Sequence, residues 1–380
     1  MSRSRLARGS PGLLGLAIGG AGADRRALAR LLSVVERGGS GARELSALTV
    51  PMAGQAYSVG LTGAPGSGKS TLTSTIVTEA LRKGDGPIAV LAVDPSSPLS
   101  GGAILGDRVR MQEHSLRSDV FIRSLATRGH VGGLAAAVPD AIRLLDATGW
   151  RLILVETVGV GQVEVEVAGT CDSVVVVVNP GWGDAVQANK AGLLEIADVL
   201  VINKADRPGV RETRRDLAHM IQLSGALSWK PPIVETVATT GEGTAALLDA
   251  LGAHRSHLDE TGGLERRRQL RMSTEAGRIA VDIFAREVAR YVERIDARGS
   301  GLVSPAAGPA RAGPAGEAGS AGEAGSAGEA GSAGESEATG GQSAAPNISE
   351  VAGELAAQQI GPAQAAEHIV AEVARRLSGK

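Results

Sequence analysis

The chain has 380 residues, with 39 Lys and Arg against 41 Asp and Glu for a formal net charge of -2, and only 3 Trp, 2 Tyr and 2 Phe. A chain without a basic stripe or aromatic platforms lacks the usual means of holding a polyanion, so nucleic acid is excluded as the main partner. One cysteine excludes an intramolecular disulfide, and no apolar run reaches the roughly 18 residues of a membrane span, so we expect a cytoplasmic protein with no membrane partner.

The first 50 residues are expected to form a helical extension. Residues 24–37 place four aliphatic side chains at helical spacing and four arginines on the other face, which is typical of an amphipathic helix. The arginines and serines near the start are also compatible with a mitochondrial transit peptide, and this alternative stays open.

Residues 51–260 carry the pattern of an α/β domain. Short runs rich in Val, Ile and Leu alternate with helical stretches, and such runs are typical of strands that are buried on both faces of a parallel sheet. We therefore predict a doubly wound, mostly parallel sheet. The predicted strands are residues 57–61, 88–93, 152–155, 174–178, 199–202 and 233–237.

The first predicted strand runs into a sequence that matches the phosphate-binding loop G-x-x-x-x-G-K-[ST], and a helix follows it. Glycines allow successive backbone N–H groups to converge on phosphate oxygens, and the positive end of the helix dipole adds to this. We expect Lys69 to reach the β- and γ-phosphates as a catalytic residue, and Ser70 to ligate Mg²⁺. The residues expected to bind the nucleotide here are Gly63, Ala64, Pro65, Gly66, Ser67, Gly68, Lys69, Ser70 and Thr71.

Acidic residues follow or end two of the other predicted strands. Glu156 ends one of them and precedes Gly159, so we expect the carboxylate near Mg²⁺ and the glycine N–H near the γ-phosphate. Asp94 ends another and is expected either to ligate Mg²⁺ through water or to orient the attacking water. Asp107, on the loop that follows Asp94, is a further candidate for this metal site.

The sequence Asn203-Lys204-Ala205-Asp206 follows the fifth predicted strand. Guanine presents its N1–H and N2–H donors side by side, so the Asp206 carboxylate can accept both, whereas adenine presents an acceptor at N1. We expect Asn203 to tie this loop and approach the base, and the stem of Lys204 to cover the ring. The bound nucleotide is therefore predicted to be GTP or GDP.

Beyond the α/β domain the composition changes twice. Residues 261–298 are predicted to form a helical arm that packs on the sheet or dimerises. Residues 299–346 are almost entirely Gly, Ala, Ser, Pro and Glu, with the hexapeptide Ala-Gly-Glu-Ala-Gly-Ser three times in tandem, which is typical of a disordered linker. Residues 347–380 regain helical spacing and are predicted to form a C-terminal helix.

In this order, the motifs resemble those of the MeaB/ArgK family, which are G proteins of the SIMIBI class of phosphate-loop GTPases. The resemblance rests on the phosphate loop, the guanine motif and four further segments, which are residues 93–97, 106–111, 127–129 and 156–162. It implies a GTP-hydrolysing chaperone that gates adenosylcobalamin loading and protects a cobalamin-dependent acyl-CoA mutase, such as methylmalonyl-CoA mutase.

The resemblance also implies slow GTP hydrolysis and a homodimer formed through C-terminal helices. A mobile loop at residues 183–190 would couple the partner to hydrolysis, with Asp184 and Lys190 as its participants. A solvated helix start is the other interpretation of that pair. The repeat tract departs from the family pattern because it interrupts the helical arm.

Two other functions stay open. A metal-insertion GTPase of the same broad fold would need a Cys and His cluster, whereas Cys171 stands alone and His254 and His257 form a single pair. A kinase that acts on an amino-acid transport protein would preferably select ATP, which Asp206 disfavours.

Overall fold

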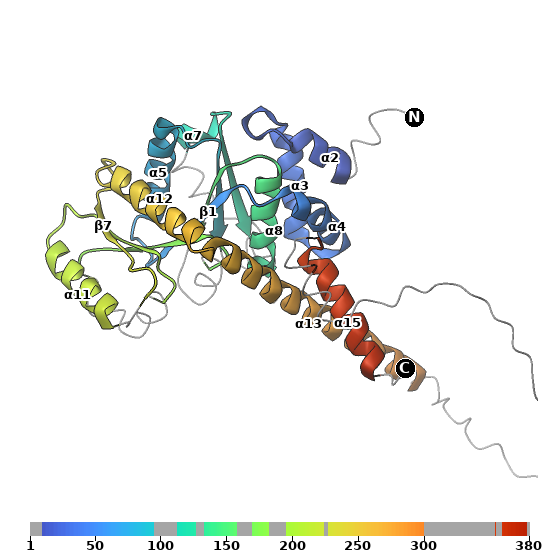
Figure 1. Ribbon diagram of the computed structural model, residues 1–380. Coiled ribbons are helices and arrows are strands. Elements are labelled where there is room, and N and C mark those ends of the chain that lie inside the picture. Colours follow the sequence, from blue (N-terminus) through green and yellow to red (C-terminus); the bar gives the residue numbers. More distant parts are fainter. Residues whose placement is uncertain are drawn as a thin grey trace, which may run out of the picture.

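The computed structural model describes residues 10–94, 112–126, 133–157, 169–181, 195–223, 227–299, 354 and 359–377. They form a seven-stranded sheet with helices on both faces, and a long C-terminal helix extends away from this body (Figure 1). Within these residues, no helix is long and apolar enough to cross a membrane.

The strands pair in the order β3-β2-β4-β1-β5-β6-β7, and every neighbouring pair is parallel. This confirms the predicted doubly wound α/β fold. All strands therefore end at one edge of the sheet, called here the carboxyl edge, and begin at the opposite amino edge. The strands are β1 (Tyr57–Gly63), β2 (Ile88–Asp94), β3 (Val120–Ala126), β4 (Leu152–Thr157), β5 (Ser173–Val178), β6 (Val199–Asn203) and β7 (Ile233–Thr236).

Helices cover both faces of the sheet. One face packs on α5 (Lys69–Lys83) and α12 (Thr244–Glu260), and the other on α8 (Gly133–Ala147) and α11 (Val210–Leu223). β5 sends its valines alternately to both faces, and all of its residues are buried. This explains why the strand is an unbroken apolar run in the sequence.

The N-terminal helices pack beside α8, and α3 also contacts the edge strand β3. They are α2 (Ser10–Ala17), α3 (Arg25–Arg37) and α4 (Gly39–Thr49), with the short 3-10 turns η1 (Gly20–Gly22) and η2 (Val50–Met52). The Asp24 side chain caps α3 by accepting the backbone N–H of Arg26 at 2.8 Å. The helix predicted over residues 24–37 is present, and its aliphatic face is buried against the rest of the protein.

Two C-terminal helices lie side by side (Figure 1). They are α13 (Gly263–Gly299), at the place of the predicted arm, and α15 (Pro362–Leu377). Small side chains, Ala276 and Ala365, pack at their contact, and Glu367 of α15 pairs with Arg43 of α4 at 3.3 Å. The predicted linker lies almost entirely outside the described residues.

The edge strand β3 is absent from the predicted strands. Its sequence contains Arg123 and Ser124, so it lacks the uninterrupted apolar run that marks the central strands. An edge strand tolerates polar residues because part of it stays accessible. Arg123 is nevertheless held, since its guanidinium pairs with Glu36 of α3 at 2.5 Å.

Candidate nucleotide-binding site

The loop between β1 and α5 depends on glycines. Gly63, Gly66 and Gly68 have φ angles of 139°, 71° and 89°, which side-chain-bearing residues rarely adopt. A Cβ on Gly63 would collide with the backbone carbonyl of Val177 in β5, and a Cβ on Gly68 would collide with the side-chain amide of Asn203. Glycine is therefore needed for the loop to pass this close to its neighbours.

Donor groups of this loop pair with the loop's own carbonyls. Lys69 Nζ donates to the carbonyls of Gly63 at 2.6 Å and Ala64 at 3.2 Å. The Ser67 backbone N–H donates to the Ala64 carbonyl at 3.1 Å, while the buried Ser67 hydroxyl has no partner among the described residues. Such donors at the positive end of a helix suit an anion such as phosphate.

A serine hydroxyl and a carboxylate meet beside Lys69. The Ser70 hydroxyl, in the first turn of α5, donates to Glu156 Oε1 near the end of β4. Ser70 is 7% exposed and Glu156 is 1% exposed. Hydroxyl and carboxylate oxygens are the hard ligands that Mg²⁺ prefers, and two protein ligands beside a phosphate site are typical for this ion. The pair therefore fits the predicted magnesium site.

A pocket of about 120 Å³ lies at the carboxyl end of β6. Its wall residues are Gly68, Thr71, Asn203, Lys204, Asp206, Arg207, Val237, Ala238 and Thr239. Asn203 is held on both sides, because its Nδ2 donates to the Ser67 carbonyl at 2.7 Å and its Oδ1 accepts the Ala238 backbone N–H at 3.1 Å. The pocket thus brings the phosphate loop, the predicted guanine motif and the loop after β7 together.

The phosphate loop and the guanine motif are linked by a second contact. Lys204, whose φ is 59°, donates from Nζ to the Gly66 carbonyl at 2.6 Å. The Nδ2 of Asn179, just after β5, is 3.5 Å from the same carbonyl oxygen. Sequence reasoning did not identify Asn179, although its position directly after a central strand is the signal that led to Glu156.

Another unpredicted contact holds α7 (Gln112–Ser115) to α5. The Ser74 hydroxyl lies 2.7 Å from Glu113 Oε1 and 3.0 Å from His114 Nε2. His114 is buried. Ser74 follows Ser70 by one helical turn, so this contact fixes α7 on the helix that begins at the phosphate loop.

Several predicted site residues lie outside the described part of the chain. These residues are Asp107, Gly159, Asp184 and Lys190. The backbone of Asp94 ends β2, and the neighbouring Val93 is paired in register with Thr157 of β4. Asp94 therefore lies at the same edge as Glu156, but its side chain is also outside the described part.

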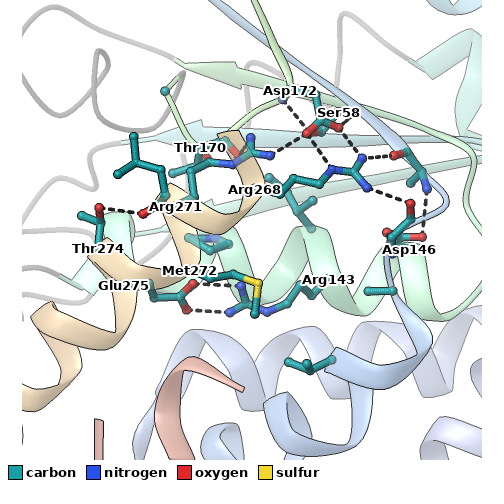
Figure 2. A pocket seen from close by; sticks show the side chains of 18 of the residues that line it. Ser58, Arg143, Asp146, Thr170, Asp172, Arg268, Arg271, Met272, Thr274 and Glu275 are labelled. Carbon is teal, nitrogen blue, oxygen red and sulfur yellow. Dashed lines mark hydrogen bonds and ion pairs between the residues drawn. The ribbon is translucent and has the colours of Figure 1, made fainter. Parts of the chain in front are cut away.

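The amino edge holds a different charged region, where α13 begins. Asp172, just before β5, accepts hydrogen bonds from Arg268 at 2.8 Å, from Arg271 at 2.6 Å and from the Ser58 backbone N–H at 3.0 Å (Figure 2). Burial alone would raise the pKa of Asp172, but the two guanidinium groups outweigh it and hold that pKa well below the ordinary value of 3.8. Ion pairs therefore attach α13 to the sheet.

A second buried aspartate strengthens this attachment. Asp198 accepts two hydrogen bonds from Arg267, at 2.8 and 2.9 Å, and lies 3.2 Å from His254 Nε2. The Nδ1 of His254 lies 2.5 Å from the Ser173 hydroxyl, so serine, histidine and aspartate are in line. Ser173 and His254 are 0% exposed, and no substrate can reach them. We therefore assign the network to stability and name Asp172, Asp198, Arg267, Arg268 and Arg271 the α13 anchor.

A cavity of about 340 Å³ lies next to the anchor, between α13, α8 and η2 (Figure 2). Its wall combines apolar side chains such as Ile142 and Met272 with ion pairs, including Glu275 to Arg143 at 2.5 Å. None of the predicted nucleotide-site residues that the structure describes lines this cavity.

The metal-insertion alternative finds no support in the described part of the chain. No group of three or more His, Cys, Asp and Glu that could hold a metal occurs there. Cys171 is buried, and burial raises the pKa of its thiol to about 12, so the thiol stays protonated. His254 is engaged in the buried network, and the ring of His257 packs at a tilt against Trp229, with 5.1 Å between the ring centroids.

Sequence comparisons agree with the motifs. The family model described as methylmalonyl Co-A mutase-associated GTPase MeaB matches residues 28–292. A protein of Pyrococcus abyssi, provisionally named as a GTPase, is 50% identical over 275 residues, which cover 71% of this chain and 85% of that protein. A protein of Caenorhabditis briggsae named methylmalonic aciduria type A homolog, mitochondrial, is 33% identical over 221 residues, or 57% of this chain and 54% of that protein.

The fold comparison agrees as well. The crystal structure of a LAO/AO transport system kinase is similar with a TM-score of 0.54 and 26% sequence identity, over 80% of this chain and 95% of that chain. The family model covers well over half of the residues, and the matched range includes the phosphate loop, the strand ends and the base pocket described above. The chain belongs to the family of methylmalonyl-CoA mutase-associated GTPases.

Proposed function

We propose that the protein hydrolyses GTP to GDP and phosphate, and that it does so as a chaperone of a cobalamin-dependent acyl-CoA mutase. The main support for the GTPase proposal is the direct contact between the guanine motif and the phosphate loop. Asn203 and Lys204 of the guanine motif each donate to a carbonyl of the phosphate loop, at 2.7 and 2.6 Å. A guanine base bound to Asp206 would therefore help to position the phosphates of the same nucleotide.

In the proposed reaction a water molecule attacks the γ-phosphorus in line, the bond to the β–γ bridging oxygen breaks, and GDP leaves. Lys69 and the backbone N–H groups of the loop turn from their own carbonyls to the phosphate oxygens and neutralise the charge that develops there. Asp94 orients the water or holds the metal's water shell, and the Gly159 N–H contacts the γ-phosphate.

Magnesium fits the oxygens of Ser70 and Glu156, with Asp94 and Asp107 as the other proposed members of its site. When bound, the ion supplies positive charge that stabilises the transferred phosphoryl group. Ser70 and Glu156 are already in contact, so little rearrangement is needed to present both oxygens.

The direct test is phosphate release from GTP by the purified protein, with and without Mg²⁺. The proposal predicts slow release that needs the ion and that is lost in Ser70→Ala. Ser256→Ala, an exposed serine on α12, is the matched control and should behave as the unchanged protein. No release above the rate of GTP in buffer would contradict the proposal.

The mutase partner is supported by the family and by the name of the nematode relative. In the proposal the nucleotide state gates adenosylcobalamin delivery to the mutase and protects it from inactivation, with Asp184 and Lys190 coupling the partner to hydrolysis. Methylmalonyl-CoA, isobutyryl-CoA and ethylmalonyl-CoA mutases can each be mixed with the protein. Complex formation and faster GTP hydrolysis with one of them support the proposal, and neither effect with any of them contradicts it.

A homodimer through α13 is also proposed. Leu270, Val281 and Phe284 are 70%, 71% and 45% exposed. Leu270 and Phe284 are two heptads apart, and Val281 lies one turn before Phe284, so the three share one side of the helix that a second copy can cover. Sedimentation should give a dimer that Val281→Asp splits, whereas a monomeric unchanged protein would contradict the proposal.

A kinase remains the second candidate, because the similar solved structure is described as a transport system kinase. Both reactions use a phosphate loop, and they differ in nucleotide and acceptor. Incubation with γ-labelled GTP or ATP, with and without a purified transport binding protein, separates them. Label released to water from GTP supports the GTPase, and label transferred from ATP to the added protein supports the kinase.

A further inference from the structure

We propose that Asn179 is a positioning residue for the phosphate loop, and that its side chain fixes one peptide group of the loop for contact with the β-phosphate. The inference deepens the proposed function, on which it rests. Asn179 belongs to none of the motifs that point to nucleotide binding, and it reaches the loop from a strand that those motifs leave unused.

The position of Asn179 follows from the pairing of β1 with β5. Gly63, the last residue of β1, lies in register with Val177 of β5. The chain therefore passes beside the phosphate loop immediately after β5, where Asn179 stands. Its Nδ2 is 3.5 Å from the Gly66 carbonyl oxygen, which also accepts Lys204 Nζ at 2.6 Å. Two side chains from different strand ends thus converge on one backbone oxygen.

The orientation of this carbonyl decides where the next N–H points. The carbonyl of Gly66 and the N–H of Ser67 belong to the same planar peptide group and point in opposite directions. When Asn179 and Lys204 hold the oxygen outward, the Ser67 N–H is directed into the loop, where it meets the Ala64 carbonyl at 3.1 Å. That inner side of the loop is where a phosphate oxygen would replace the carbonyl.

The next peptide group is fixed in the same way. Asn203 Nδ2 holds the Ser67 carbonyl at 2.7 Å, which directs the Gly68 N–H inward. Gly66 has a φ of 71°, and because glycine has more backbone conformations open to it than other residues, contacts to its carbonyl help to hold this one. Holding both carbonyls restricts the loop before the nucleotide arrives and lowers the entropy lost on binding.

The other half of the Asn179 amide supports a functional assignment. Its Oδ1 is buried and has no hydrogen-bond partner in the described part of the chain. A buried acceptor left without a partner costs stability, so an amide retained there for stability alone would be a poor choice.

The test compares nucleotides that do and do not carry a β-phosphate. GDP, GTP and guanosine are titrated into the full-length protein and into Asn179→Ala, with guanosine followed by ligand-observed NMR. We expect the Kd for GDP and GTP to rise about fivefold in the variant, while the Kd for guanosine stays within about twofold. In steady-state hydrolysis, KM should rise by a larger factor than kcat falls. The lost contact positions the phosphate-binding loop, and Asn179 takes no part in the chemical step.

Asn179→Asp provides the second variant, since it keeps the size of the side chain and replaces the donor with a carboxylate oxygen. That oxygen would face the Gly66 carbonyl or draw Lys204 away from it, so we expect a loss of GDP affinity at least as large as in Asn179→Ala. Gln222→Ala, an exposed amide on α11, is the matched control and should bind all three ligands as the unchanged protein does.

The outcomes separate the two proposals. GDP affinity that is unchanged in both Asn179 variants overturns the inference and leaves the GTPase in place. Equal losses for GDP and guanosine also overturn it, because they assign Asn179 to the stability of the fold. No binding of GDP or GTP by the unchanged protein contradicts the proposed function itself, and the inference with it.

Discussion

The two edges of the sheet place charged groups in different ways. At the carboxyl edge, Lys69 and the Ser67 backbone N–H donate to carbonyls of the phosphate loop itself. At the amino edge the α13 anchor pairs every carboxylate with arginines, and Asp172 is 2% exposed. One edge keeps its donors available for an anion, whereas the other uses its charges to fix a helix.

A binding site and a structural anchor differ in whether their charged groups can change partners. Both regions contain buried ionisable groups, and the amino edge even aligns Ser173, His254 and Asp198. Charges at the anchor neutralise one another, because the partners are all protein groups with good geometry. Donors at the carboxyl edge can change partners within a glycine-rich loop. Hydrogen-bond donors that can change partners next to a pocket are therefore a better sign of ligand binding than buried ion pairs.

The largest effect is expected from a substitution at the carboxyl edge that weakens nucleotide binding. Lys69→Ala removes the ammonium group that donates to the Gly63 and Ala64 carbonyls inside the phosphate loop, and a charge-assisted contact to phosphate is lost. GDP and GTP should bind about 10³-fold more weakly, which corresponds to about 4 kcal/mol. Titration with a fluorescent GDP analogue measures this. Retained tight binding would exclude the loop as the phosphate site.

Breaking the anchor should change stability instead of binding. Asp172→Asn leaves Arg268 and Arg271 without their carboxylate and should lower the free energy of unfolding by about 3 kcal/mol. Chemical denaturation measures the loss. Asp249→Asn, which removes an exposed partner of Lys83, is the matched control and should cost at most about 0.5 kcal/mol. Equal effects of the two substitutions would show that the anchor is not stabilising.

Acid should weaken the same anchor. Because the pKa of Asp172 is lower in the folded protein than its ordinary 3.8, the carboxylate stabilises the fold fully above that value. This contribution, on the order of 2 kcal/mol, is lost as the pH falls from about 4 toward the folded-state pKa. Denaturation midpoints between pH 6 and pH 3 should fall less steeply in Asp172→Asn. A parallel fall in both proteins would contradict this assignment.

The smallest effect concerns the contact between α5 and α7. Ser74→Ala removes the hydroxyl that meets Glu113 and His114, at a cost of about 1 kcal/mol. Amide hydrogen exchange in residues 112–126 should become faster, while exchange in the rest of α5 changes little. If exchange at residues 112–126 matches that of the unchanged protein, the hydroxyl does not hold α7.

The sequence allowed the carboxyl edge to be predicted because its residues are close together in the chain. Gly63 to Ser70 and Asn203 to Asp206 each form one short motif, and each follows an apolar strand. The pattern of central strands also gave the α/β fold. The edge strand β3 was not predicted, because Arg123 and Ser124 interrupt its apolar run.

The anchor could not be predicted in this way. Asp172 and Arg268 are 96 residues apart, and nothing in either local sequence indicates the other. The contact of Asn179 with Gly66 was not predicted for a related reason. The two residues are 113 positions apart, and the pairing of β1 with β5 brings them together. Contacts of this kind follow from sheet order, which the strand pattern alone does not determine.

We propose that the carboxyl edge binds guanine nucleotides and that Asp206 recognises the base. The most direct measurement compares GTP with xanthosine triphosphate, in which an N2–H donor is replaced by an oxygen, for the unchanged protein and for Asp206→Asn. If Asp206 recognises the base, the unchanged protein should prefer GTP and the variant should shift its preference toward xanthosine triphosphate. The same preference for GTP in both proteins would contradict it.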